Sequence, residues 1–124
     1  MTDIRSAETR ADVFKVMPSA HWANARTAGF FTGSADDVRD GFIHLSNADQ
    51  LSGTLAKYFR DQPDLLLIGF SSADLGGALK WEASRGGALF PHYYGALPVT
   101  LALWQRPLRL GPDGIRHVDD KDKL

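Results

Sequence analysis

Residues 65–70, with the sequence LLLIGF, constrain the fold more than any other stretch of the chain. The run is apolar apart from a single glycine, and the turn-forming residues SSADLGG follow it at 71–77. A short apolar run that ends in this way predicts a strand covered on both faces. We therefore expect a central strand here. Its neighbouring strands and the helices that cover it are expected in the sequence before and after it.

The clearest helix is predicted directly upstream, over residues 48–60. One apolar stripe runs along it, with members at positions i, i+4, i+7 and i+8: Leu51, Leu55, Tyr58 and Phe59. A capping pair fits the start of this helix, either Ser46 with Asp49 or Asn47 with Gln50.

A shorter helix is predicted near the N-terminus, over residues 20–28. Ser19 suits its N-cap, and Gly29 occupies the position at which helices commonly end. Trp22 and Ala25 form the apolar stripe that would face the core.

Further segments have the composition of strands: residues 12–17, 41–45, 79–82 and 98–104, with an edge at 107–110. Alternation in the first places Val13, Lys15 and Met17 on one face. Turn-forming composition predicts loops over 33–41 and 83–95. Because strands and helices do not alternate as regular units, the pattern favours an α+β fold with two main helices and a mixed or antiparallel sheet.

The composition is that of one globular domain, predicted over residues 1–124 with its core at 12–114, a loose N-terminal arm and a polar tail. The absence of cysteine excludes disulfides, thiolate catalysis and cysteine-based zinc sites. A formal net charge of −1 argues against broad electrostatic binding to nucleic acid or anionic lipid. No apolar run is long enough to span a membrane, and the expected location is the cytoplasm.

The segment DGFIHLS at 40–46 has the most chemical content. His44 is expected at the end of a strand, directly before a capped helix start. A helix N-terminus favours a phosphate or carboxylate, and an imidazole there can donate a hydrogen bond or move a proton. His44 is therefore a candidate catalytic residue and Ser46 a candidate ligand contact. The alternative is a structural histidine bonded to a loop carbonyl, with Ser46 only capping the helix.

A second candidate group is KWE at 80–82. Glu82 is a candidate catalytic residue because its carboxylate can bind ribose hydroxyls or act as a base, and Trp81 can stack on a flat ring. Alternation along a strand points these two side chains to opposite faces. The structural alternatives are core packing for Trp81 and a surface ion pair for Glu82 with Lys80 or Arg85.

A third group is FPHYYG at 90–95, where His92 and Tyr94 are candidate ligand contacts that combine stacking faces with polar tips. The alternative is an aromatic loop packed on the sheet with satisfied hydroxyls. We expect this segment and the strand end that carries His44 to line one common hollow. A metal site of His44, His92 and Glu82 lacks the HxxxH or HExxH spacing, so no metal is expected.

These motifs, in this order, resemble those of a bacterial family, the domain-of-unknown-function 952 family, from about Val13 to Gly114. The shared motifs are VFKVMP with Trp22, DGFIHLS with Gln50, the LLL strand, KWE, LFPHYYG and PLRLGPDG. The resemblance implies a small α+β domain similar to the ADP-ribosyltransferase fold, in which a split sheet clasps nicotinamide adenine dinucleotide (NAD).

The resemblance also implies roles for single residues. Within the wider fold, a group similar to the RNA 2′-phosphotransferases holds the dinucleotide with histidines, and some members of the present family carry a histidine where this chain has Lys15. That leaves His44 as the matching histidine and Lys15 as a candidate ligand contact. Glu82 resembles, in residue type, the catalytic glutamate of other transferases of the fold.

Three functions are compatible with these residues. The first is a binding domain for a nucleotide, a dinucleotide or another small anion, held by His44, Ser46 and the aromatic side chains. The second is an enzyme of the ADP-ribosyltransferase type, with NAD as candidate cofactor and Glu82 polarising the ribose as the nicotinamide bond breaks. The third is a protein that docks a partner through residues 90–95. RNA is a further candidate partner if four basic residues gather near the pocket: Lys57, Arg60, Lys80 and Arg85.

Overall fold

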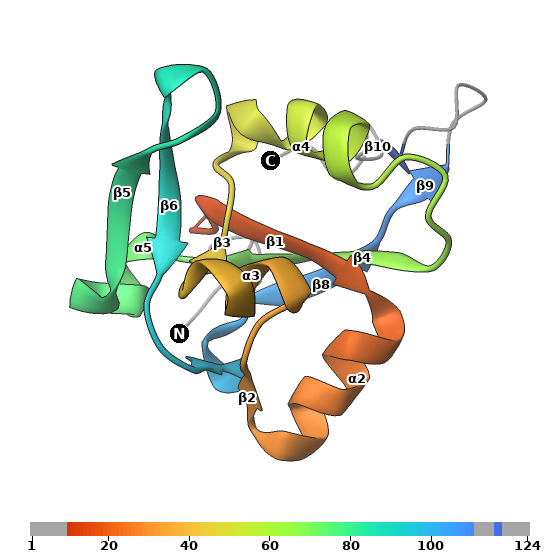
Figure 1. Cartoon of the computed structure of the whole chain (residues 1–124). Coiled ribbons are helices and arrows are strands. Elements are labelled where there is room, and N and C mark those ends of the chain that lie inside the picture. Colours follow the sequence, from red (N-terminus) through yellow and green to blue (C-terminus); the bar gives the residue numbers. More distant parts are fainter. Residues whose placement is uncertain (1–9, 111–115, 118–124) are drawn as a thin grey trace.

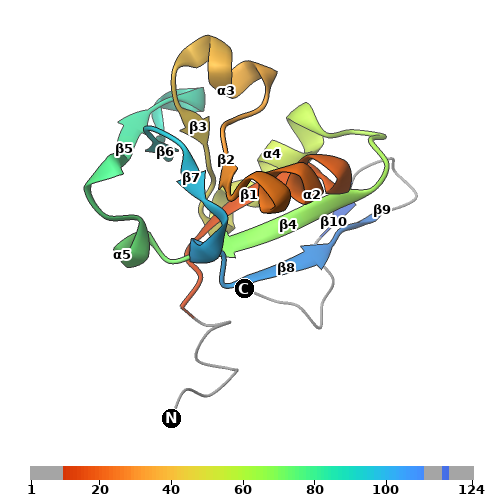
Figure 2. The same cartoon turned by 90° about the horizontal axis from the view of Figure 1, so that it is seen from below.

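The chain folds into two three-stranded and two two-stranded antiparallel sheets with a few helices (Figures 1 and 2). The computed structural model describes residues 10–110, 116 and 117. Its strands are β1 (Val13–Pro18), β2 (Phe30–Phe31), β3 (Ile43–His44), β4 (Leu65–Phe70), β5 (Leu79–Ala83), β6 (Leu89–Tyr93), β7 (Leu97–Pro98), β8 (Trp104–Pro107), β9 (Arg109–Leu110) and β10 (Arg116–His117). Its helices are α2 (Ser19–Ala28), α3 (Ala35–Asp40), α4 (Leu51–Tyr58) and α5 (Ser72–Leu75), with 3₁₀ turns η1 (Ala48–Gln50), η2 (Gly76–Ala78), η3 (Arg85–Gly87) and η4 (Val99–Leu101).

The predicted central strand is confirmed as β4. It pairs antiparallel with β1 on one side and with β8 on the other, and all of its residues except Leu66 are buried. A Cβ atom at Gly69 would lie 2.6 Å from the indole of Trp104, so only glycine fits at this point of the strand. The apolar run thus holds the first three-stranded sheet together.

A second three-stranded sheet has the order β3-β6-β5 and lies beside the first (Figure 1). The short segment after β3 joins the two sheets. The backbones of Phe14 and Ser46 exchange hydrogen bonds of 2.8 and 2.9 Å, and the N–H of Leu45 donates to the carbonyl of Pro91 at 3.0 Å. Residues 43–46 therefore run between β1 of one sheet and β6 of the other, which fixes where His44 lies.

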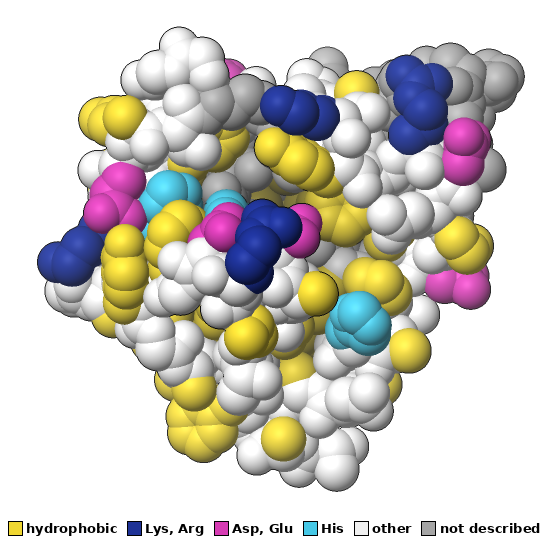
Figure 3. Space-filling model, viewed as in Figure 1, with side chains coloured by type: hydrophobic (Ala, Val, Ile, Leu, Met, Phe, Trp, Pro, Cys, Tyr) yellow, Lys and Arg dark blue, Asp and Glu magenta, His cyan; other side chains and the backbone are white. Residues whose placement is uncertain are grey.

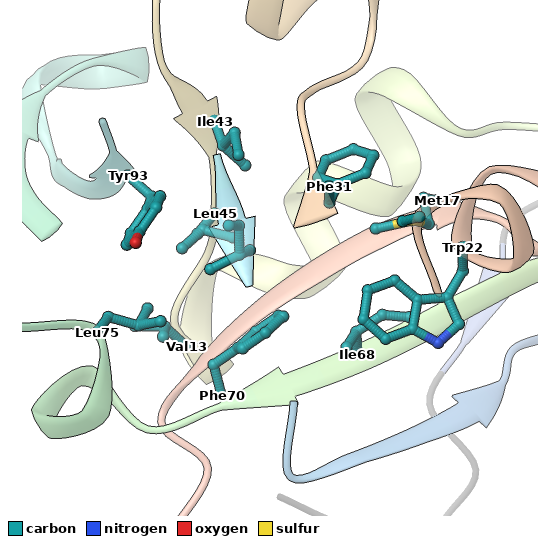
Figure 4. Close-up of a cluster of buried hydrophobic side chains, with 12 residues drawn as sticks. Val13, Met17, Trp22, Phe31, Ile43, Leu45, Ile68, Phe70, Leu75 and Tyr93 are labelled. Atoms are coloured by element: carbon teal, nitrogen blue, oxygen red, sulfur yellow. The ribbon is translucent and has the colours of Figure 1, made fainter. Parts of the chain in front are cut away.

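The core has two parts, separated by the first sheet, as the alternation in β1 predicts. Val13 and Met17 belong to the larger cluster, which also contains Trp22, Phe31 and Tyr93 (Figure 4). The smaller cluster lies on the other face of β1, and its buried members are Phe14, Val16, Leu51, Leu55, Leu65, Leu67 and Leu108. The result is a small α+β domain with antiparallel sheets, in agreement with the predicted fold class.

The two predicted helices are present as α2 and α4, with differences at their starts. Ser19 is the first residue of α2, and Pro18 rather than Ser19 occupies its N-cap position. At η1, which precedes α4, the structure selects one of the two possible capping pairs: Asn47 and Gln50 bond each other's backbone N–H groups at 2.9 and 3.0 Å.

Three sequence expectations were wrong. The predicted loop at 33–41 contains α3, and the predicted loop at 83–95 contains β6, whose Leu89–Tyr93 pair with both neighbours. The predicted strand at 98–104 is mostly the turn η4, and β8 begins only at Trp104. In the first two cases, contacts with distant strands and a local cap outweigh turn-forming composition. Residues 1–9 and 118–124, within the predicted arm and tail, lie outside the described residues.

Candidate functional site

A cavity of about 240 Å³ opens between β1, α3, α4 and the β3–β6 pair. Its polar lining includes Lys15, Asp37, Arg39, His44, Ser46 and His92. Its aromatic and aliphatic lining includes Phe14, Val16, Leu45, Tyr58, Phe59 and Phe90. Figure 3 shows histidine side chains beside acidic and basic ones where this face of the molecule is hollowed. The lining of the cavity thus combines charged side chains with apolar and aromatic ones.

Asp37 of α3 is the buried acceptor among the charged residues of the lining, with 2% of its surface exposed. Its Oδ1 accepts from the backbone N–H of His44 at 3.0 Å and lies 2.6 Å from His44 Nδ1. Its Oδ2 accepts from the backbone N–H of Ser34 at 2.9 Å and lies 3.0 Å from the Nζ of Lys15. Burial alone would raise the pKa of Asp37, but the bond from His44, the charge of Lys15 and the backbone bonds hold that pKa far below its usual value.

Lys15 is the buried cation that faces this carboxylate. Besides its ion pair with Asp37, its Nζ donates to the backbone carbonyl of His44 at 2.8 Å. Burial lowers the pKa of Lys15, and the adjacent Asp37 opposes that shift. The sequence expectation gave Lys15 a ligand-binding role. It does line the cavity, but its ammonium is also bonded to Asp37 and to the chain at His44.

A capping box places Asp37 at the start of α3. Ser34 Oγ accepts from the backbone N–H of Asp37 at 3.2 Å, and the Asp37 carboxylate accepts from that of Ser34 in return. Such boxes satisfy amide groups that the first helical turn leaves free. The same carboxylate therefore caps its helix and binds both Lys15 and His44.

We expect Ser34→Ala to lower the free energy of unfolding by about 1 kcal/mol, because the N–H of Asp37 loses its acceptor. Urea denaturation of the variant measures this loss. The matched control is Ser52→Ala on the exposed side of α4, which should stay within about 0.5 kcal/mol of wild type. Equal effects of the two substitutions would contradict the capping role.

His44 lies between two carboxylates. Nδ1 is 2.6 Å from Asp37 Oδ1, and Nε2 is 3.0 Å from Asp40 Oδ2. Arg39 donates to the other oxygen of Asp40 at 2.9 Å, and this bond is the main reason why the pKa of Asp40 is lowered. Both histidine contacts are hydrogen bonds only when both ring nitrogens carry a proton. In that state His44 presents a positive charge and two donors, both of them engaged.

His92 has a different set of partners. Its Nδ1 lies 2.9 Å from Glu82 Oε1, and the hydroxyl of Tyr94 donates to the same oxygen at 2.7 Å. The bond from Tyr94, followed by that from His92, lowers the pKa of Glu82, and the carboxylate in turn raises the pKa of Tyr94. The imidazole of His92 thus lies between the Glu82 carboxylate and the cavity.

The two histidines are direct neighbours in the second sheet, because His44 of β3 pairs with His92 of the adjacent strand β6. Their ring centroids are 5.6 Å apart, in an edge-on arrangement. Phe42 fills the space beside them: its ring stacks on His92 at 4.0 Å and contacts His44 at 4.7 Å. This packing fixes the orientation of both imidazoles.

The structure brings some of the predicted site residues together and leaves others apart. His44, His92, Lys15 and Ser46 line the cavity, so the two segments expected to share a hollow do so. Ser46 does not cap the helix; its Oγ lies 3.0 Å from the hydroxyl oxygen of Thr54.

Glu82, Trp81 and Tyr94 are absent from the lining of this cavity. Glu82 and Tyr94 reach the site only through His92. The core-packing alternative for Trp81 is wrong, because 43% of its surface is exposed. Of the basic residues considered for RNA, none with a described side chain lines the cavity: Lys57, Arg60 and Lys80. The side chain of Arg85 lies outside the described part of the chain.

Sequence analysis missed Asp37 as part of the site, and it gave no role of their own to Asp40 and Phe42, which lie in the segment 40–46 that it singled out. The available signal was the pattern Ser34-x-x-Asp37, a capping box at the start of a helix, within a stretch that was assigned to a loop. In the described part of the chain, no group of three or more His, Cys, Asp or Glu side chains is arranged to hold a metal ion. None of the described helices is long and apolar enough to cross a membrane.

The fold and the site define a small α+β domain with a histidine-lined cavity. Residues 16–104 match the family described as Protein of unknown function (DUF952), and the chain belongs to this family. It is similar to the crystal structure of protein CC0527 from Caulobacter crescentus, with 45% identity, a TM-score of 0.86, and 90% of this chain and 98% of that chain covered. For the solution NMR structure of CC0527 these values are 46%, 0.76, 84% and 90%. No curated protein matches the chain.

Proposed function

We propose that the protein binds a small ligand of the nucleotide class in the cavity around His44 and residues 90–95. The observation that carries the proposal is the pairing of His44 with His92, which puts two imidazoles on the wall of one cavity. The lining also includes the aromatic side chains of Phe90 and Tyr58. A pocket lined by apolar side chains and a few convergent polar groups is typical of small-molecule sites, and a heterocyclic ring with polar edges suits such a lining.

The size of the cavity limits which part of a ligand it encloses. Its volume of about 240 Å³ is below the roughly 300–1,000 Å³ of pockets that bury drug-sized ligands. A base or a ribose fits this volume, whereas the remainder of a dinucleotide would lie outside it. Arg39, at the edge of α3 and largely exposed, is a cation available to an external phosphate once it leaves Asp36 or Asp40.

Thermal denaturation with AMP, ADP-ribose, NAD and nicotinamide tests the proposal. A compound that binds at about 100 times its dissociation constant should stabilise the protein by roughly 2.7 kcal/mol. His92→Gln should remove most of this shift. The control His21→Gln, on the exposed surface of α2, should keep it. A flat response to every compound, or an equal response in His92→Gln, would exclude binding at this site.

A second candidate is catalysis of the ADP-ribosyltransferase type, and one observation favours it. Glu82 keeps a low pKa beside Tyr94 and His92, so a carboxylate is present at neutral pH next to the histidine pair. The ADP-ribosyltransferase-like fold that the sequence motifs imply would favour the same activity. Release of nicotinamide from NAD measures the activity. Glu82→Gln should abolish turnover if Glu82 supports catalysis, and should leave affinity nearly unchanged if the domain only binds.

A further inference from the structure

The imidazole of His92 is nearly enclosed, with 4% of its surface exposed, yet within the described part of the chain only one of its two nitrogens has a hydrogen-bond partner. Nδ1 is bonded to Glu82, while Nε2 has no hydrogen-bond partner among the described residues. The one fully buried side-chain nitrogen or oxygen without a partner in the described part of the chain is Nε1 of Trp104. His92 lines the cavity, and Nε2 is the ring nitrogen that remains available to a group bound there.

The partners of Nδ1 decide what Nε2 can do. Glu82 Oε1 receives the hydroxyl proton of Tyr94 and faces His92 Nδ1, which is possible only if Nδ1 also donates. In a neutral imidazole with its proton on Nδ1, the other nitrogen carries a lone pair. Phe42 stacks on the ring and restrains its plane, and the contact with Glu82 holds Nδ1 on the Glu82 side.

The second histidine has no nitrogen open to a ligand in this way. Asp37 and Asp40 occupy both nitrogens of His44. The histidine pair is therefore asymmetric: the nitrogens of His44 face fixed acceptors of the protein, and His92 has one nitrogen reserved for a group from outside. Lys80, which is opposite His92 in the strand register, is exposed.

We propose that His92 presents an unprotonated Nε2 to the cavity and accepts a hydrogen bond from a hydroxyl or N–H group of the ligand. Glu82 is the positioning residue that fixes this tautomer, and Tyr94 holds Glu82 in place. The identity of the ligand rests on the proposed function, but the state of the ring does not. A ribose hydroxyl or the N–H edge of a base supplies the required donor.

The tautomer is measured on the free protein by NMR of ¹⁵N-labelled histidine, at a pH at which the His92 ring is neutral. Wild type should show a protonated Nδ1 and an unprotonated Nε2. Glu82→Ala should raise the fraction of the Nε2–H tautomer several-fold. Glu82→Gln keeps an oxygen acceptor and should preserve the wild-type tautomer, and Tyr94→Phe should preserve it as well. The control is Asp49→Asn, an exposed carboxylate on η1.

A protonated Nε2 in neutral wild type would overturn the proposal, even if Glu82→Ala did not fold. An unchanged tautomer in a folded Glu82→Ala protein would remove the positioning role of Glu82. Addition of AMP, the probe ligand, should move the Nε2 resonance. If AMP shifts the melting temperature but leaves this resonance in place, AMP binds to the protein without contacting His92 Nε2. If AMP does not bind while Nε2 is unprotonated, the result contradicts the proposed function for AMP and leaves the proposed tautomer of His92 supported.

Discussion

Asp37→Ala is expected to lower the free energy of unfolding by about 3–5 kcal/mol, the range found when one partner of a buried ion pair is removed. The substitution leaves the ammonium of Lys15, 7% exposed, with only the carbonyl of His44 as a partner. It also removes the acceptor for the backbone N–H groups of Ser34 and His44. Urea denaturation measures the loss, which is a large part of the roughly 5–15 kcal/mol that stabilises a typical domain.

A double variant separates the unpaired charge from the other losses. Lys15→Met with Asp37→Asn removes both charges and keeps an oxygen that can cap α3 and accept from His44. It should be more stable than Asp37→Asn alone, because no isolated ammonium remains buried. If Asp37→Ala does not fold, the difference between these two variants still measures the cost of leaving the Lys15 ammonium without its carboxylate. If Asp37→Ala lowers the free energy of unfolding by less than 1 kcal/mol, the ion pair and hydrogen bonds of Asp37 contribute little to stability.

Acid should destabilise the protein through the same carboxyl group. The folded pKa of Asp37 lies well below the value of 3.8 that a free aspartate side chain has. The stability contributed by a carboxyl group with a lowered pKa is fully present above the unfolded value and is lost as the pH falls through the folded value. We therefore expect a constant contribution near pH 7 and a loss on the order of 2 kcal/mol between about pH 5 and pH 2.

The Asp37→Asn variant isolates this effect, since asparagine does not titrate. Its unfolding free energy, measured by urea denaturation over the same pH range, should fall less steeply than that of wild type. The pKa values of Glu82 and Asp40 are also lowered, but both side chains are partly exposed and remain in the variant. Parallel curves for the two proteins would show that Asp37 is not the group responsible.

Much of the fold could be predicted because its signals are local. The apolar run of β4 and the stripe of α4 each bury a continuous set of side chains, so the hydrophobic pattern in the sequence matches the element that forms. The strand β6 was missed because its identity depends on partners far away in the chain. Pro91 and the nearby glycines predict a loop, yet pairing with β3 and β5 makes the segment a strand.

The candidate site shows the same division. His44 and His92 stand out in sequence because histidine next to aromatic and glycine residues is chemically distinctive. Asp37 does not stand out, since a carboxylate in a stretch such as ADDVRD has the composition of an exposed helix or loop. Only its neighbours in space make it the buried acceptor: Lys15 from β1 and His44 from β3.

The amino-acid sequence alone therefore determined the family, the α+β class, the central strand and the histidines worth attention, because these depend on residue type and short-range spacing. Tertiary structure alone decided that Asp37 joins Lys15 to His44, that Glu82 reaches the cavity through His92, and that Trp81 lies outside it. These facts depend on which strands pair and in which register, and that choice is made by packing between segments distant in the chain.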